Sequence, residues 1–201
     1  MVIAATQSPT LASALWPTGE GTRLLRLAAL AVVGSMLLTL SAKIQVPFYP
    51  VPMTMQTFAV LVLGMAYGWR LGAATMVLYL AEGAVGLPVF AGTPAKGIGI
   101  PYMLGPTGGY LIGYVLSAAA LGWLAERGWD RSVFWTAVAM LIGNVVIYVP
   151  GLLWLGTVVG WEKPVLQWGL TPFILGDLTK LALAAAVMPL AWTLLGRRKG
   201  S

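Results

Sequence analysis

An aspartate and a lysine lie within an otherwise apolar segment near the C-terminus of the chain. Asp177 and Lys180 are three residues apart in TPFILGDLTKLALAAAVMPLAW, and this spacing places both side chains on one face of a helix. A charge at membrane depth costs roughly 2.5 kcal/mol or more, so such residues usually mark a ligand site or a relay. The alternative interpretation is a mutual ion pair that serves only the packing of the helices.

The composition of the chain indicates an all-α integral membrane protein. Of its 201 residues, 59% are hydrophobic and only 9% are charged, whereas about 25% are charged in an ordinary soluble domain. We expect one membrane domain over residues 1–201. Cysteine and histidine are absent, which excludes disulfides, thiol nucleophiles, a histidine base and the commonest zinc ligands. We therefore expect no cofactor and no metal.

Six stretches are apolar enough to cross a bilayer as helices, which takes roughly 17 to 25 residues each. The predicted spans cover residues 23–42, 54–69, 71–87, 106–125, 132–155 and 171–195. Pro150 is expected to bend or end the fifth span, and Pro189 to kink the sixth. Residues 1–21 form an N-terminal segment without the basic and apolar regions of a signal peptide, and we expect it to be loosely held or to lie on the surface.

The distribution of Lys and Arg predicts how the spans are oriented. If the N-terminus is inside, the inner segments hold eight of these residues and the outer segments hold three. The positive-inside rule then predicts a cytoplasmic-membrane protein with both termini inside, and it explains the +6 net charge better than nucleic-acid binding does. Three longer connections, 43–53, 88–105 and 156–170, fall outside and can fold as a lid over a cavity.

The strongly polar side chains of the predicted spans lie in their outer halves. They are Gln56, Glu82, Tyr110, Asn144, Asp177 and Lys180. This asymmetry predicts a cup that opens to the exterior above a closed apolar floor, because a channel would need polar lining through its full depth. Each residue also has a structural interpretation: hydrogen bonding between helices for Gln56 and Asn144, an interfacial position for Tyr110, and a helix end facing headgroups for Glu82.

Three segments resemble the BioY family, the biotin-specific substrate-capture subunits, or S components, of energy-coupling-factor vitamin transporters. They are VPFYPVPMTMQTFAVLVLG at 46–64, GLPVFAG at 86–92 followed by GPTGGYLIGY at 105–114, and the pair Asp177 and Lys180. The resemblance implies an S-component-like bundle of six helices that binds biotin near the outer surface. It also implies partnership with a transmembrane coupling subunit and two ATPase subunits.

Under this resemblance the polar residues acquire roles toward biotin. Asp177 accepts hydrogen bonds from the N–H groups of the ureido ring, while Lys180 donates to the ureido oxygen or neutralises Asp177. The hydroxyl of Tyr110 and the amides of Gln56 and Asn144 complete the polar shell. Aromatic residues then cover the rings of the ligand; the candidates are Phe48, Tyr49, Phe90 and Tyr102.

The carboxylate of biotin needs a cation or hydrogen-bond donors of its own. Lys96, in the connection after the third predicted span, is one candidate. The backbone N–H groups of Gly108 and Gly109, at the start of the fourth span, are the other. Of the glycines in GPTGGYLIGY, we expect Gly108 to allow a ligand to approach the backbone and Gly113 to allow close helix packing.

The partner and the class of function leave further alternatives open. Small residues on the first span, Ala28, Ala31 and Ser35, serve either docking of a coupling subunit or packing within the chain. An S component for another vitamin is an alternative function. A membrane-embedded enzyme is disfavoured, because the six acidic residues are scattered and neither His nor Cys occurs. No GxxxxGK[ST] motif is present, so we expect separate ATPase subunits to supply the energy.

Overall fold

The structure is a computed structural model that describes residues 8–16 and 22–199. Six longer helices account for most of the described residues: α2 (Arg23–Lys43), α3 (Gln56–Tyr67), α4 (Trp69–Ala84), α6 (Gly108–Ala125), α7 (Val133–Val159) and α9 (Ile174–Lys199). Each coincides with one predicted span to within a few residues. The backbone hydrogen bonds of a helix are internal, which makes this the favoured structure for such apolar sequence in lipid.

Short elements occupy the connections between the longer helices. They are α1 (Leu11–Leu15), α5 (Gly99–Met103), α8 (Val165–Gly169), the 3-10 turns η2 (Trp129–Arg131) and η3 (Thr171–Phe173), and the strands β1 (Gln45–Val46) and β2 (Met53–Thr54). The two strands form an antiparallel hairpin in which Gln45 pairs with Thr54 and Val46 with Met53.

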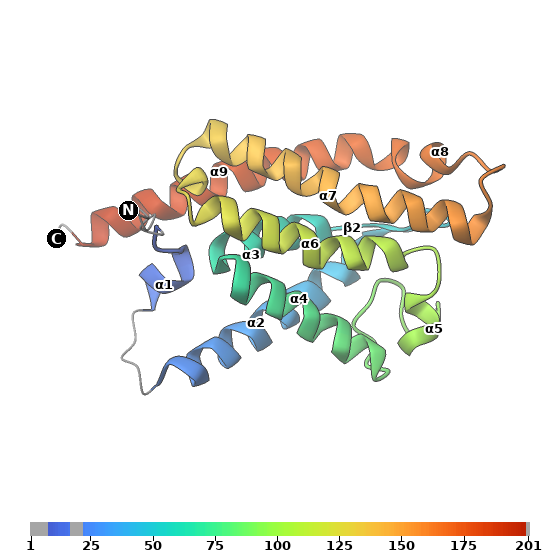
Figure 1. The fold of residues 1–201 in the computed structure, drawn as a ribbon, viewed down its shortest axis with the longest axis horizontal. Helices are drawn as coiled ribbons and strands as arrows, with labels where there is room; N and C mark the ends of the chain where they lie inside the picture. The colour runs from blue at the N-terminus through green and yellow to red at the C-terminus, as the bar shows by residue number, and fades with distance from the viewer. Residues whose placement is uncertain (1–7, 17–21, 200–201) are drawn as a thin grey trace, which may run out of the picture.

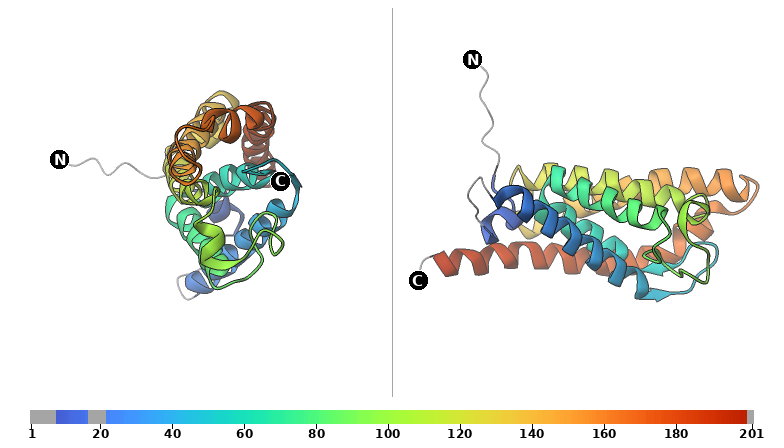
Figure 2. Two further views of the ribbon diagram at one scale, coloured as in Figure 1. Left: turned by 90° about the vertical axis from the view of Figure 1, so that its right-hand side faces the viewer. Right: turned by 90° about the horizontal axis from the view of Figure 1, so that it is seen from below.

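The helices α6, α7 and α9 run along the long axis of the molecule, and α2 and α4 run obliquely to it (Figure 1). One end of the bundle, here called the loop end, carries the hairpin, α5 and α8. The other, the terminal end, carries α1 and the last turns of α9. Both views in Figure 2 place the hairpin beside the segment that joins α4 to α6. The loop end therefore brings together segments that are far apart in the sequence.

Four helical stretches among the described residues are long and apolar enough to cross a membrane. They are Arg23–Lys43, Gly108–Ala125, Val133–Val159 and Val165–Gly196. The apolar helix α3 has only 12 residues and rises about 18 Å, which is less than the hydrocarbon core of about 30 Å. The four long stretches alone make this a multi-pass arrangement.

Neither proline ends its helix. α7 runs through Pro150 to Val159, and α9 contains Pro189 within Ile174–Lys199. Packing against α6 supports α7 at this point: a Cβ added at Gly109 would lie 2.2 Å from the carbonyl oxygen of Pro150. α7 therefore extends about one turn beyond residue 155, the predicted end of the fifth span, because neighbouring helices compensate a proline inside a membrane bundle.

The interior divides into two clusters with different chemistry. Toward the loop end the buried cluster includes the tyrosines Tyr79, Tyr110 and Tyr114. The second cluster is mainly aliphatic and includes Leu121 and Met140. Within α1, Leu11 and Ala12 are buried in contact with α3 and α9, so this part of the N-terminal segment packs against the bundle. The remainder of the predicted segment, 1–7 and 17–21, lies outside the described residues.

Candidate ligand-binding site

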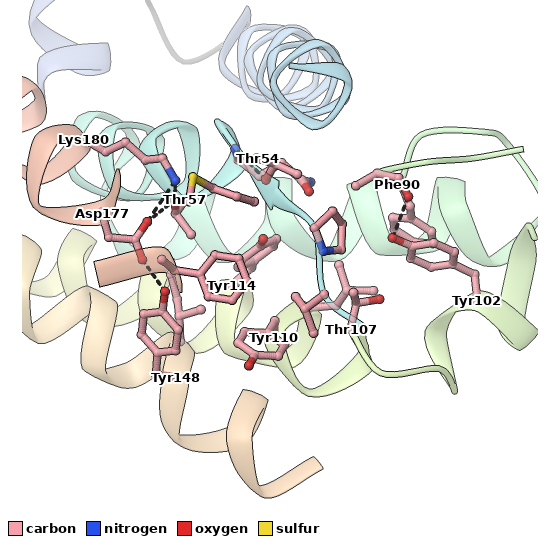
Figure 3. Close-up of a pocket in the computed structure, with 18 residues that line it drawn as sticks. Thr54, Thr57, Phe90, Tyr102, Thr107, Tyr110, Tyr114, Tyr148, Asp177 and Lys180 are labelled. Carbon is pink, nitrogen blue, oxygen red and sulfur yellow. Dashed lines mark hydrogen bonds and ion pairs between the residues drawn. The ribbon is translucent and has the colours of Figure 1, made fainter. Parts of the chain in front are cut away.

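Asp177 and Lys180 form a buried ion pair at the loop-end half of α9. Each residue is 6% exposed, and Nζ of Lys180 lies 2.9 Å from Oδ1 of Asp177. Thr57 of α3 closes a triangle with them: its hydroxyl donates to Oδ1 of Asp177 at 3.2 Å and accepts from Nζ of Lys180 at 3.0 Å. Figure 3 shows the three side chains converging from α3 and α9 at one side of the pocket.

A tyrosine from α7 completes the environment of the carboxylate. The hydroxyl of Tyr148 donates to Oδ2 of Asp177, so the described residues give this carboxylate three hydrogen bonds. An ionised carboxylate has about four lone-pair positions, and an ammonium has three N–H donors. The described partners of Lys180 use two of those donors. One acceptor position, on Oδ2 of Asp177, and one N–H of Lys180 therefore remain for a ligand.

The ion pair lines a cavity whose empty space is about 550 Å³, its opening included. The hairpin, α3, the segment after α4, α5, α6, α7, η3 and α9 all contribute. The lining residues are Val51, Pro52, Met53, Thr54, Gln56, Thr57, Phe90, Ala91, Tyr102, Thr107, Tyr110, Leu111, Tyr114, Ile147, Tyr148, Phe173, Asp177 and Lys180.

Aromatic rings form the wall of the cavity opposite the ion pair (Figure 3). The rings of Phe90 and Tyr102 are stacked, with centroids 5.0 Å apart and planes 17° apart, and Tyr79 meets Phe90 edge-on at 5.4 Å. The hydroxyl of Tyr102 donates to the carbonyl oxygen of Ala91 at 2.8 Å. Burial raises the pKa of Tyr102 above its usual range, so this hydroxyl stays a donor at neutral pH. The wall offers flat apolar surface.

Two further predicted residues, Gln56 and Tyr110, line the cavity, and each donates a hydrogen bond within the protein. The amide nitrogen of Gln56 donates to the hydroxyl of Tyr79 at 2.7 Å, and that hydroxyl donates to the carbonyl oxygen of Val89 at 3.0 Å. The hydroxyl of Tyr110 donates to the carbonyl oxygen of Gly169 at 2.8 Å. Both residues therefore brace the walls as well as lining them.

Four other predicted residues are not among those that line the cavity. Asn144 lies instead in an apolar groove between α7 and α9, and its Oδ1 is buried without a partner among the described residues. Glu82 accepts a hydrogen bond from Ser35 of α2. Lys96 is exposed. The N–H of Gly108 donates to the carbonyl oxygen of Gly105 at 3.1 Å, and a Cβ on Gly108 would lie 2.0 Å from the carbonyl oxygen of Met103.

Sequence reasoning missed Thr57 and Tyr148, the two hydroxyls on the ion pair. A signal for Tyr148 was present, because it lies one turn after Asn144 on the same face of α7. Thr57 follows Gln56, yet its role depends on how α3 packs against α9, which periodicity does not reveal. Of the predicted aromatic residues, Phe90 and Tyr102 line the cavity. Tyr49 is 88% exposed, and Phe48 meets the ring of Phe173 at 6.1 Å.

The site suits binding of a small molecule with a flat apolar body and a neutral polar group. A neutral group fits because the ion pair itself carries no net charge. It needs an N–H that donates to Asp177 and an acceptor for the free N–H of Lys180. Within 8–16 and 22–199, no group of three or more His, Cys, Asp or Glu side chains could hold a metal ion. These features define a class: a helical, multi-pass membrane protein with a small-molecule cavity near one end of its bundle.

Comparisons with known proteins identify the family within this class. The sequence profile of the BioY family matches residues 11–197, and the chain belongs to this family. It is 36% identical to a biotin transporter of Thermotoga maritima over 78% of this chain and 90% of that protein. It is also 36% identical to a biotin transporter of Rhizobium etli, over 82% of this chain and 90% of the relative.

A solved structure shares the fold. The crystal structure of the S component for biotin from an ECF-type ABC transporter matches with a TM-score of 0.73, covering 88% of this chain and 95% of the other. Sequence identity in this match is 22%, so the likeness concerns the arrangement of the helices.

Proposed function

We propose that this chain is the substrate-capture subunit of a biotin uptake system and that the cavity at the loop end binds biotin. The relatives in its family are biotin transporters, which makes transport rather than catalysis its activity. The observation that carries the site assignment is the buried Asp177–Lys180 pair in the lining of the cavity. A membrane protein places charge at this depth at considerable cost, and a ligand that uses both groups accounts for it.

The chemistry of biotin fits the donors and acceptors that remain. Its ureido ring presents N–H groups beside a carbonyl oxygen, which complement the open acceptor position of Asp177 and the open donor of Lys180. Its thioether ring is apolar and fits the surface formed by Phe90 and Tyr102. Its carboxylate remains assigned by prediction to Lys96 or to the backbone at Gly108, neither of which is among the lining residues.

Energy for uptake comes, in this proposal, from a transmembrane coupling subunit and two ATPase subunits. The chain lies in the cytoplasmic membrane as six spans with both termini inside, and the loop end faces the exterior. Of the small residues on α2, Ser35 is 1% exposed and bonds to Glu82, which favours packing for this residue. Ala28 and Ala31 line a groove toward the terminal end and remain candidates for subunit docking.

Equilibrium binding of biotin to variants of the purified protein tests the site. Asp177→Asn and Lys180→Met each strand one buried charge, and we expect each to weaken binding by at least about 2 kcal/mol, roughly thirty-fold. The double variant removes both charges and restores neutrality. If the pair serves only packing, the double variant binds biotin normally; if the pair contacts biotin, binding stays weak although the protein folds.

An S component for another vitamin is the second candidate, and a thermal-shift screen separates the two. Ligand that binds only the folded state raises the unfolding temperature in proportion to the logarithm of its concentration over Kd. We expect stabilisation by biotin and none by thiamine or riboflavin at equal concentration. Stabilisation by either of those and not by biotin would reassign the ligand while leaving the cavity in place.

A further inference from the structure

Lys43, the last residue of α2, contacts a segment that lies far from it in the sequence. Its Nζ lies 2.6 Å from the carbonyl oxygen of Pro88, 2.9 Å from that of Phe90 and 3.2 Å from that of Thr93. Oγ1 of Thr93 lies 3.0 Å from the same nitrogen. An ammonium has three N–H donors, so all three are engaged here and one of them is shared between two oxygens.

The convergence of these oxygens favours a cation. Three carbonyl oxygens and a hydroxyl, all from residues 88–93, surround one point, and without a positive donor their partial negative charges repel one another. The segment has little regular structure to oppose that repulsion. Within it, the N–H and the hydroxyl of Thr93 both donate to the carbonyl oxygen of Phe90, at 3.3 Å and 2.6 Å. From outside, the hydroxyls of Tyr79 and Tyr102 donate to the carbonyl oxygens of Val89 and Ala91. Charge-assisted hydrogen bonds are about twice as strong as neutral ones, so Lys43 holds the shape of this segment together with Tyr79 and Tyr102.

The segment 88–93 carries part of the cavity wall. Phe90 and Ala91 line the cavity, and Phe90 is 1% exposed with its ring stacked on Tyr102. Its ring also fills the space beside Gly83 of α4, where an added Cβ would lie 1.9 Å from it. A displacement of the segment would therefore move an aromatic surface that contacts the ligand in the proposed complex.

The end of α2 also leads directly into a second part of the wall. β1 begins two residues after Lys43, and the hairpin supplies Val51, Pro52, Met53 and Thr54 to the lining. α2 itself contributes no residue to the lining among those described. Its last turn is thus joined to the hairpin through the chain and to residues 88–93 through one side chain.

We propose that Lys43 is a positioning residue that ties the end of α2 to the Phe90 wall, so that the hairpin and residues 88–93 keep their places together. The consequence for retention of biotin rests on the proposed function. The consequence for the shape of the empty cavity does not. Loss of the ammonium releases residues 88–93, opens this side of the cavity and shortens the residence of the ligand.

Hydrogen exchange on the full-length protein in detergent, without ligand, tests the structural part. Lys43→Met keeps the length and the apolar stem but removes the ammonium, and Lys43→Arg keeps charge and donors. Lys163→Met, at an exposed lysine in the connection after α7, is the matched control. We expect exchange at the amides of 89–93 to rise at least about ten-fold in Lys43→Met, less in Lys43→Arg, and not at all in the control, with α6 and α7 unchanged.

The dissociation rate of biotin from the same variants tests the functional part. We expect it to rise at least about five-fold in Lys43→Met, with partial rescue in Lys43→Arg. Unchanged exchange at 89–93, or a uniform rise across all helices, would overturn the positioning role. Faster exchange with an unchanged dissociation rate would overturn the link to ligand retention. A protein that shows the exchange pattern but binds no biotin would leave Lys43 as assigned and would refute the proposed ligand instead.

Discussion

The hydroxyls that bond to Asp177 stabilise a charge pair in the interior of this bundle. A buried carboxylate without hydrogen bonds is costly, and removing one partner of a buried pair typically destabilises a protein by about 3–5 kcal/mol. Here Thr57 bonds to both charged groups, and Tyr148 bonds to the second carboxylate oxygen. The pair is thus held in one geometry before any ligand arrives, which reduces the ordering that binding requires.

The substitution Tyr148→Phe tests this preorganisation at one atom. It removes the donor to Oδ2 of Asp177 while keeping the ring, and we expect biotin binding to weaken by about 1 kcal/mol, roughly five-fold. Tyr67→Phe is the matched control, because its hydroxyl bonds to the carbonyl oxygen of Leu30 at 3.0 Å and it does not line the cavity. Calorimetric titration measures the affinity of both variants for biotin, and equal affinities would show that the hydroxyl of Tyr148 does not contribute to binding.

A second buried acid, Asp130, lies in η2 at the terminal end. It is fully buried, and Nε1 of Trp192 in α9 donates to its Oδ2 at 2.6 Å. Its Oδ1 has no partner among the described residues, and the guanidinium of Arg131 lies over the Trp192 ring, 4.8 Å from the centroid. Burial raises the pKa of Asp130 above its usual value, and the hydrogen bond from Trp192 opposes part of that rise.

Because the pKa of Asp130 is raised in the folded state, its contribution to the free energy of unfolding changes with pH in a definite direction. The folded protein holds this proton more tightly than the unfolded chain, so the contribution is fully present below the unfolded pKa of about 3.9. It is lost as pH rises through the folded pKa of Asp130. Asp130→Asn keeps an acceptor for Trp192 without a charge. We expect its unfolding temperature, relative to the unsubstituted protein, to increase from about pH 4 to about pH 8. Glu162→Gln, at an exposed acid, serves as control, and a pH-independent difference would contradict the assignment.

At the scale of elements, the contact between α6 and α7 positions several cavity residues. Glycines let the two backbones approach: a Cβ on Gly109 would lie 2.2 Å from the Pro150 oxygen and 2.3 Å from Cβ of Trp154, and one on Gly113 would lie 2.7 Å from the Ile147 oxygen. Tyr110 and Tyr114 on α6, and Ile147 and Tyr148 on α7, line the cavity beside this seam. The close helix packing expected at Gly113 is present, and the two backbones approach even more closely at Gly109.

The substitution Gly109→Ala tests the seam. The added methyl meets backbone atoms that cannot move aside, and we expect a loss of about 1–3 kcal/mol in unfolding free energy. Gly196→Ala in α9 is the control, because nothing lies within 4 Å of its Cβ position, and there we expect a small gain from the better helix former. Thermal unfolding in detergent measures both. Equal unfolding temperatures for the two variants would show that the seam tolerates a wider separation.

The long helices could be predicted from the sequence because apolar runs of about 20 residues have few other structures available in lipid. Asp177 and Lys180 could be predicted as a pair because helical spacing alone places them together. The hairpin, α5 and α8 could not, since short elements in connections depend on contacts made after the helices assemble. For the same reason the contacts of Lys43 with the cavity wall could not be predicted from the sequence. Lys96 stays a prediction for the ligand carboxylate.

At the scale of the whole molecule, three pairs of arginine and tryptophan lie near the terminal end. Three guanidinium groups lie within 5 Å of an indole centroid, in the pairs Arg70 with Trp69, Arg127 with Trp123 and Arg131 with Trp192. Tryptophan favours the interface between membrane and water, and arginine favours the cytoplasmic side. The pairs support the proposal that the terminal end faces the cytoplasm and the cavity end faces the exterior.

Labelling of single introduced cysteines tests this orientation, and the absence of native cysteine makes the experiment clean. Lys163→Cys lies in the connection after α7, and Ser132→Cys lies directly before α7 at the other end; both positions are exposed. We expect a membrane-impermeant maleimide to label Lys163→Cys in intact cells and Ser132→Cys only after permeabilisation. The reverse pattern would place the loop end in the cytoplasm and would refute capture of biotin from outside.

The most direct test of the account is an experimental structure of the protein with biotin bound. We expect the ureido ring at the ion pair, with an N–H and the ring oxygen within hydrogen-bond distance, about 2.7–3.2 Å, of the Asp177 carboxylate and Lys180 Nζ respectively. The thioether ring should lie toward Phe90. Biotin bound in the groove between α7 and α9, or anywhere that leaves the Asp177–Lys180 pair without a ligand contact, would contradict the central claim.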